Sequence, residues 1–231
     1  MKRCLYCHEA NESSIKWASL FKHQGDKLLC KACHEQLQPI SYNYCPKCYK
    51  ISIEGLCTDC EQWEIHYNDH DPLTKNISLY EYNEWMKELI AQWKYRGDYV
   101  LGEVFRSEFR RLFVEVFKNM TENSIVLPIP LSSDRLYERG FNQASQLVSF
   151  LAEDNKDEQH LLSRLTNEKQ SKKSREERLG MENPFTLNAR INKTVILVDD
   201  IYTTGQTLRH AAKLLKEQGC PQVYSYTLIR G

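Results

Sequence analysis

Two adjacent carboxylates, Asp199 and Asp200, follow directly after the four apolar residues 195–198. A continuous apolar, β-rich run predicts a strand that is buried on both faces, and open α/β sheets bind ligands at the carboxyl ends of such strands. The residues that follow are small, polar and rich in hydroxyl groups: Thr203, Thr204, Gly205, Gln206 and Thr207. Where such a run enters a helix, its amides and hydroxyls can surround a phosphate. Together these parts predict a site for a sugar phosphate, with the sugar hydroxyls on the acids and the phosphate on the loop.

A second stretch supplies groups that can bind an anion. Pro130 ends the sequence Pro-Ile-Pro after a short apolar run, which predicts a rigid loop at the end of another strand. Arg139 offers a forked guanidinium, while Asn142 and Gln143 stand at the start of a predicted helix whose positive end would face the same place. Arg139 taken alone would be read as a solvated surface charge. Its combination with the loop and the helix start favours an anion-binding role.

Eight of the nine cysteines form four Cys-x-x-Cys pairs within the first 60 residues. Each pair directs two thiolates at one point, and two pairs supply the four ligands of a tetrahedral zinc ion. Taken in order, the pairs predict two zinc sites, and the spacing also leaves an interleaved pairing open. Four thiolates close such a site, so we expect structural zinc. The predicted ligands are Cys4, Cys7, Cys30 and Cys33 in one site and Cys45, Cys48, Cys57 and Cys60 in the other.

The elements that must position these groups alternate between strands and helices. Strands are predicted over residues 77–82, 125–127, 195–198 and 223–229, and helices over 84–93, 101–117, 144–151 and 207–218. This alternation, with apolar strands, predicts an α/β fold with a parallel sheet. The polar stretch 61–75 reads as a linker. We therefore predict two domains, a double zinc ribbon over residues 1–66 and the α/β domain over 67–231.

The charge balance and the apolar patterning exclude several classes of protein. Thirty-one Lys and Arg residues balance 31 Asp and Glu residues, which excludes a globally basic nucleic-acid-binding surface. No apolar run approaches the roughly 18 residues that span a bilayer, and the basic N-terminal residues are not followed by the apolar stretch of a secretory signal. We therefore expect a cytoplasmic protein, in which reducing conditions favour metal binding over disulfides.

One local stretch is basic. Residues 163–178 hold six basic and three acidic side chains, and they lack the apolar periodicity of a helix or a strand. This pattern predicts a mobile loop, which could act as an electrostatic strip for nucleic-acid phosphates; a plain solvated loop is another alternative. The residues predicted to bind nucleic acid are Lys169, Lys172, Lys173 and Arg175.

The run over residues 195–207 resembles the signature of the type I phosphoribosyltransferase superfamily, in which four apolar residues and two acids precede a Thr-Thr-Gly loop that binds phosphoribosyl pyrophosphate (PRPP). The resemblance implies that fold, and it implies as one reading of the basic stretch 163–178 that this loop closes over the active site. It also implies that Asp199 and Asp200 hold the ribose hydroxyls during catalysis, that the loop holds the 5′-phosphate, and that the stretch around Arg139 holds the pyrophosphate. Mg²⁺ would bind mainly to oxygen atoms of PRPP, as this hard cation prefers.

Joined to the four cysteine pairs and to Lys94-Tyr95-Arg96-Gly97-Asp98, the run Arg-Gly-Phe-Asn-Gln at 139–143 resembles the ComF family over nearly the whole chain. That resemblance implies a competence protein for the uptake or processing of transforming single-stranded DNA. It implies docking to the helicase-like ATPase ComFA and a peripheral place on the cytoplasmic side of membrane machinery. Two alternatives stay open, namely a Mg²⁺-dependent phosphoribosyltransferase with an unknown acceptor and a PRPP-sensing regulator.

Overall fold

The computed structural model describes residues 3–11, 28–52, 54–95, 98–120, 123–151, 161–165 and 183–231 of the 231-residue chain. Two helices precede the sheet, α1 (Lys31–His34) and α2 (Thr58–His66). The remaining elements are β1 (Lys75–Glu81), α3 (Glu84–Tyr95), the 3-10 helix η2 (Tyr99–Phe105), α4 (Arg106–Phe117), β2 (Ser124–Pro128), α5 (Ser133–Arg139), α6 (Gln143–Leu151), β3 (Leu162–Arg164), β4 (Phe185–Leu187), β5 (Thr194–Tyr202), α9 (Gln206–Glu217) and β6 (Val223–Arg230). No helix among the described residues is long and apolar enough to cross a membrane.

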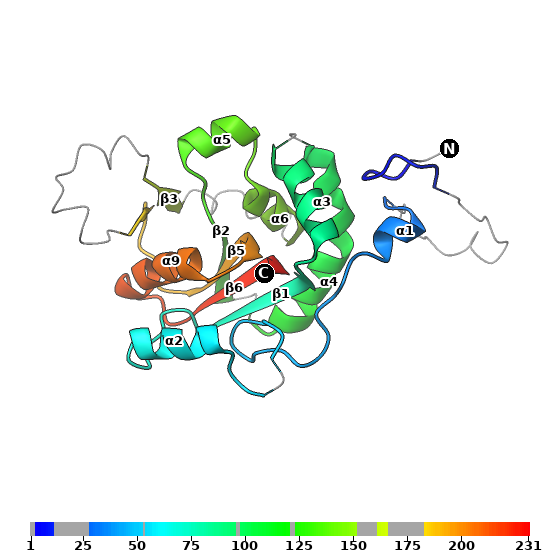
Figure 1. Cartoon of the computed structure of the whole chain (residues 1–231). Helices are drawn as coiled ribbons and strands as arrows, with labels where there is room; N and C mark the ends of the chain where they lie inside the picture. Colours follow the sequence, from blue (N-terminus) through cyan, green and yellow to red (C-terminus); the bar gives the residue numbers. More distant parts are fainter. Residues whose placement is uncertain are drawn as a thin grey trace.

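The central sheet is parallel, and its strands lie in the order β1-β6-β5-β2 (Figure 1). Parallel neighbours need long crossover connections, and here helices supply them. The short strands β3 and β4 form a separate antiparallel pair. The predicted α/β fold with a parallel sheet is confirmed, and each predicted strand coincides with a strand of this sheet.

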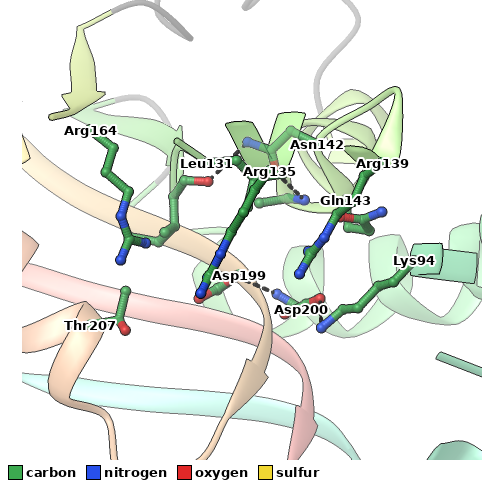
Figure 2. A pocket seen from close by; sticks show the side chains of 12 residues that line it. Lys94, Leu131, Arg135, Arg139, Asn142, Gln143, Arg164, Asp199, Asp200 and Thr207 are labelled. Atoms are coloured by element: carbon green, nitrogen blue, oxygen red, sulfur yellow. Dashed lines mark hydrogen bonds and ion pairs between the residues drawn. The ribbon is translucent and has the colours of Figure 1, made fainter. Parts of the chain in front are cut away.

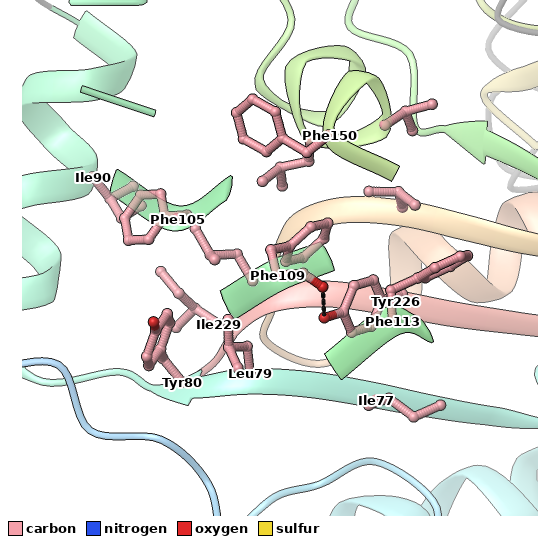
Figure 3. Packing of buried hydrophobic residues seen from close by; sticks show 14 of the residues in the cluster. Ile77, Leu79, Tyr80, Ile90, Phe105, Phe109, Phe113, Phe150, Tyr226 and Ile229 are labelled. Atoms are coloured by element: carbon pink, nitrogen blue, oxygen red, sulfur yellow. Dashed lines mark hydrogen bonds between the residues drawn. The ribbon is translucent and has the colours of Figure 1, made fainter. Parts of the chain in front are cut away.

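Both faces of the sheet are buried because successive side chains of each strand point to opposite sides. In β5, Ile196 and Val198 pack with α3, α4 and α6, and Figure 3 shows part of this cluster. Val195 and Leu197 pack on the opposite face with α9 and the second group of cysteines. This two-sided burial explains why β5 reads as an uninterrupted apolar run.

The helix α9 packs on the sheet along one narrow stripe. Leu208, Ala211, Ala212 and Leu215 are buried and recur at the spacing of one helical face. The left-handed conformation of Gly205, with φ of 76°, turns the chain from the end of β5 into this helix. The stripe therefore fixes the helix whose first turn borders the predicted phosphate loop.

The stretch between the two cysteine groups covers the outer edge of β1. Its backbone pairs with β1 through an antiparallel bridge between Pro39 and Tyr80. The amide of Ile40 donates to the carbonyl of Leu79 at 3.0 Å, and the amide of Glu81 donates to the carbonyl of Gln38 at 2.9 Å. The edge strand β1 is thus paired on both sides over this short length.

Candidate sugar-phosphate pocket and cysteine groups

A pocket of about 140 Å³ opens at the carboxyl ends of β2 and β5 (Figure 2). This is the edge at which parallel α/β sheets bind ligands. The lining comes from elements that lie far apart in the sequence, namely α3, the loop after β2, α5, α6, β3, β5 and α9. The lining residues are Lys94, Ile129, Leu131, Arg135, Arg139, Asn142, Gln143, Ala144, Arg164, Asp199, Asp200 and Thr207.

The predicted acid pair lies in this pocket. The amide of Asp200 donates to Oδ1 of Asp199 at 2.9 Å, and the carboxylate of Asp200 is ion-paired with Nζ of Lys94. Burial of its carboxyl group, followed by the nearby charge of Asp200, raises the pKa of Asp199 from its usual value of 3.8 to about 8. The pair can therefore accept hydrogen bonds from hydroxyl groups, and a bound cation would favour ionisation of Asp199.

Positive charge outweighs negative charge around the pocket. Four cationic side chains line it, Lys94, Arg135, Arg139 and Arg164, against the two acids. Figure 2 shows Arg135, Arg139 and Lys94 directed towards the acid pair. Burial, and then the nearby charge of Arg135, lower the pKa of Arg164. An anion in the pocket would relieve this repulsion, so the arrangement fits a ligand that carries several negative charges.

Gln143 offers a donor that no side chain or backbone group of the described part of the chain uses. The residue is 1% exposed, and its Oε1 accepts a hydrogen bond from Nη1 of Arg139 at 3.2 Å. Its Nε2 is buried without a partner among the described residues. A buried donor without a partner is costly, so this atom at the pocket wall points to a ligand that accepts a hydrogen bond.

Asn142 and Pro130 have a more indirect place in the site. The amide nitrogen of the Asn142 side chain donates to the carbonyl of Ile129 at 2.9 Å, and its oxygen accepts from the amide of Ala144 at 3.0 Å. Asn142 thus ties the start of α6 to the loop after β2. Pro130 lies between two lining residues and does not itself line the pocket. The two residues shape the wall from which Arg139 and Gln143 reach inwards.

The hydroxyl-rich loop borders the pocket through Thr207. The side chains of Thr203, Thr204 and Gln206 are exposed. The amides of Thr204 and Gly205 have no backbone partner in the part of the chain that the structure describes, and the amide of Gln206 donates to Oγ1 of Thr204 at 3.3 Å. Free amides ahead of a helix provide the donors that an anion needs.

Gly205 is required for a second reason besides its positive φ. A Cβ atom at this position would collide with the ring of Tyr202 and with the guanidinium of Arg209. Arg209 is 1% exposed, and its Nη1 donates to the hydroxyl of Tyr202 at 2.6 Å. The loop therefore lies directly on this buried pair of side chains.

The carbonyls on the other side of the same loop accept hydrogen bonds from the side chains of Arg230, Trp63 and Arg209. Nη1 of Arg230 donates to the carbonyls of Tyr202 and Thr203 at 3.2 and 3.0 Å. Nε1 of Trp63 in α2 donates to the carbonyl of Thr204 at 2.8 Å. Three consecutive carbonyls thus have donors, which leaves the loop's amides as its available groups.

The cysteines assemble in two groups of four, in the order of the sequence: Cys4, Cys7, Cys30 and Cys33, then Cys45, Cys48, Cys57 and Cys60. Within each group the sulfur atoms lie within 4.8 Å of one another, so each group could hold a metal ion. The Sγ atoms of Cys7 and Cys30 are 3.7 Å apart, and those of Cys48 and Cys57 are 3.5 Å apart. A tetrahedral zinc with bonds of about 2.3 Å places its sulfur ligands about 3.8 Å apart, so both groups fit this ion.

The two groups have different surroundings. The second group shares its buried cluster with Leu73 and with Val195 and Leu197 of β5. Hydrogen bonding from Cys60, supported by Arg230, lowers the pKa of Cys48 to about 4, which favours the thiolate that a metal needs. The predicted domain boundary after residue 66 assigns the second group to the N-terminal domain, although this group packs against the sheet of the other domain.

Several functional residues gave no signal of their own in the sequence. Lys94 belongs to the run 94–98 that supports the family resemblance, and this was the one indication of its importance. Arg135 stands in a local pattern that resembles an ordinary surface charge. Arg164 belongs to the basic stretch 163–178, and the structure places it at the end of β3. The predicted nucleic-acid-binding residues Lys169, Lys172, Lys173 and Arg175 lie outside the described residues.

Comparisons with known proteins give one matching family model and several similar solved structures. A family model described as "Phosphoribosyl transferase domain" matches residues 140–231. Among solved structures, the chain is similar to a hypoxanthine phosphoribosyltransferase from Staphylococcus aureus, with 18% identity, a TM-score of 0.36, and coverage of 56% of this chain and 64% of that chain.

Curated relatives cover nearly the whole chain. It is 40% identical to competence protein ComFC of Bacillus subtilis, over 98% of this chain and 94% of the relative. It is 33% identical to competence protein ComFC of Streptococcus pneumoniae, over 99% of this chain and the whole relative. With its parallel sheet, its acid pair and its two groups of cysteines, the chain belongs to the ComFC family of competence proteins, and it carries a phosphoribosyltransferase-type domain.

Proposed function

We propose that this chain binds PRPP together with Mg²⁺ in the pocket at the end of β5, and that this binding serves the uptake or processing of transforming DNA. One observation carries the proposal: a single pocket joins the acid pair, the start of α9 and four cationic side chains. A pentose that carries both a phosphate and a pyrophosphate matches that combination of groups.

Each part of the pocket has a role in this proposal. Asp199 and Asp200 accept hydrogen bonds from the ribose hydroxyls, and Thr207 with the amides of Thr204 and Gly205 holds the 5′-phosphate. Arg139 and the unpartnered Nε2 of Gln143, together with the other cations, hold the pyrophosphate. Mg²⁺ would supply charge neutralisation on the ligand's own oxygen atoms. Lys94 must release or share Asp200 when the ribose binds.

Calorimetry with PRPP and Mg²⁺ tests the proposal directly. We expect the parent protein to bind and the Asp199→Asn/Asp200→Asn double variant to bind at least about tenfold more weakly, because Asp200 loses its charge and each side chain exchanges an acceptor oxygen for an amide nitrogen. Asp134→Asn, an equivalent change at an exposed position of α5, serves as the matched control and should leave affinity unchanged. A parent protein that does not bind PRPP would refute the proposal.

The link to DNA uptake rests on the two relatives named as competence proteins. In a naturally transformable strain that lacks its own copy, we expect the parent gene to restore transformation and the double aspartate variant to fail, at equal protein level. Unchanged transformation by that variant would move the function away from the pocket, to the cysteine groups or the surface.

Docking to the ATPase ComFA on the cytoplasmic side of the membrane, and contact with single-stranded DNA, belong to the same proposal. The basic residues Lys169, Lys172, Lys173 and Arg175 are its sequence-based candidates for phosphate contacts. Binding of an oligonucleotide should weaken steeply with salt, and Lys172→Gln/Lys173→Gln should reduce that dependence. Parental binding by this double variant would exclude the basic stretch as the DNA site.

A transferase reaction is the second candidate function. The observation that favours it is the group of Arg135, Arg139 and Arg164 around the place where pyrophosphate would leave. Such fixed cations stabilise the negative charge that develops on a leaving group. Release of pyrophosphate from PRPP, measured with candidate bases, nucleotides and DNA ends, separates turnover from the binding expected of a PRPP-sensing regulator.

A further inference from the structure

A buried arginine connects the second cysteine group to the phosphate loop. Arg230, the last residue of β6, is 5% exposed. Its Nη2 donates to Sγ of Cys48 at 3.4 Å, while its Nη1 donates to the carbonyls of Tyr202 and Thr203. One guanidinium therefore spans from a predicted metal ligand to the backbone that forms the loop.

The helix α2 makes a second connection. It begins directly after Cys57 and contains Cys60, so the metal group fixes its first turn. Nε1 of Trp63, three residues after Cys60, donates to the carbonyl of Thr204 at 2.8 Å. The guanidinium of Arg209 lies 4.5 Å from the centre of the Trp63 ring, which holds the indole between the helix and the loop.

A network of buried charges also connects the second cysteine group to the phosphate loop. Asp71 and Arg209 are each 1% exposed and form an ion pair at 2.8 Å. Lys47, which lies between Cys45 and Cys48, adds a contact to the same carboxylate at 3.2 Å. A buried network of this kind is strongly destabilised when one partner moves away, so displacement of the cysteine group would disturb Arg209 and the loop that lies on it.

From these contacts we propose that the group Cys45, Cys48, Cys57 and Cys60, when it holds its metal, sets the phosphate-binding shape of the loop through Arg230 and Trp63. Arg230 and Trp63 are positioning residues: they donate to the loop's carbonyls, while the loop's amides bind the ligand. Affinity for a phosphorylated ligand therefore depends on this group and is independent of the first group. The inference rests on the proposed function for its ligand, and on the contacts above for its geometry.

The first cysteine group provides the contrast that makes this inference specific. Cys4 and Cys33 form a small cluster with Leu29, and the partly buried side chains packed around them include Trp85 of α3 and Val104 of η2. In the described part of the chain, the carbonyls of residues 202–204 accept hydrogen bonds from the side chains of Arg230, Arg209 and Trp63 and from the amide of Gly231, none of which belongs to this cluster. The two groups thus have the same ligand chemistry and different neighbours.

The test uses the 231-residue chain, calorimetry with PRPP and Mg²⁺, and metal content by mass spectrometry. Cys48→Ser should lose one metal per chain and at least about tenfold in affinity. Cys7→Ser, the matched control, should lose one metal and stay within about twofold of the parent. Arg230→Met and Trp63→Phe keep the eight cysteines of the two groups, so they should retain both metals while they weaken binding. Arg230→Lys should recover part of the loss, and Arg190→Met, at an exposed position, should have no effect.

Hydrogen exchange of the ligand-free protein provides a readout that does not depend on PRPP. We expect the segment 202–209 to exchange faster in Cys48→Ser and Arg230→Met than in the parent, and at the parental rate in Cys7→Ser. Unchanged exchange in Arg230→Met, or equal effects of Cys48→Ser and Cys7→Ser, would overturn the inference. A parent protein that fails to bind PRPP but shows the expected exchange pattern would refute the proposed function and support the coupling.

Discussion

At the scale of single residues, Asp199 shows how the pocket is prepared for a charged ligand. Its carboxyl is buried beside Asp200, and these two causes raise its pKa to about 8. The unfolded chain ionises this group near pH 4, whereas the folded chain keeps it protonated up to about pH 8. The unfolded state therefore loses the proton first, and the contribution of Asp199 to stability falls as the pH rises from about 4 to about 8.

Replacement of Asp199 by asparagine removes this pH dependence. We expect the melting temperature of Asp199→Asn, relative to the parent, to rise between pH 5 and pH 8 by at least about 2–4 °C, which corresponds to about 1 kcal/mol in a chain of this size. Thermal melts at several pH values, with Asp134→Asn as control, measure the difference. A constant offset across the pH range would contradict the raised pKa.

The sequence predicted much of the site at this scale. Asp199, Asp200 and Thr207 were predictable because they follow one buried strand, and Arg139 and Gln143 because they flank the start of a helix. Lys94 enters from α3, Arg135 from α5 and Arg164 from β3. Only the folded chain brings these elements together, so the sequence could not show that Lys94, from the run 94–98, and Arg164, from the basic stretch, would meet Arg135 at one pocket.

At the scale of elements, one glutamine joins three helical segments above the sheet. Oε1 of Gln146 in α6 accepts from the indole of Trp93 in α3 at 2.9 Å, and its Nε2 donates to the carbonyl of Tyr99 in η2 at 2.8 Å. Gly102 lies against the same amide, because a Cβ there would come within 2.6–2.8 Å of it. The predicted helix over 101–117 divides here: η2 ends at Phe105 and α4 begins at Arg106. Apolar spacing alone does not reveal that break.

Gly102→Ala should disturb this junction. We expect a loss of about 1–3 kcal/mol in the free energy of unfolding, since the added methyl group must displace a buried, hydrogen-bonded side chain. Chemical denaturation measures the effect. In a double-mutant cycle with Gln146→Ala, the cost of Gly102→Ala should shrink. An equal cost in both backgrounds would show that the strain has another origin.

At the scale of the whole molecule, the second cysteine group behaves as part of the sheet domain. Cys45 and Cys48 share a buried cluster with Leu73, Val195 and Leu197. The sequence predicted four Cys-x-x-Cys pairs and left both a sequential and an interleaved combination of them open; the structure groups them in sequential order. The sequence could not show on which surface the group packs, because that contact joins residues about 150 positions apart.

This packing leads to a prediction about truncated chains. We expect residues 36–231 to retain one metal and a cooperative unfolding transition, and residues 67–231 to melt at least about 10 °C lower, because several kcal/mol of shared core and metal binding are removed. Circular dichroism melts of the two fragments and the full chain provide the comparison. Equal stability of the two fragments would support the boundary after residue 66 as an independent domain limit.

The pairing of residues 38–40 with β1 affects whether this protein aggregates in concentrated solution. An uncovered edge strand offers unpaired amides and carbonyls to another chain, which is a common start of aggregation. Here the stretch that covers that edge is tethered at both ends by cysteine groups. Removal of the metal ions would therefore free residues 38–40 from β1. We expect the apoprotein to aggregate by pairing of exposed β1 edges before its core unfolds.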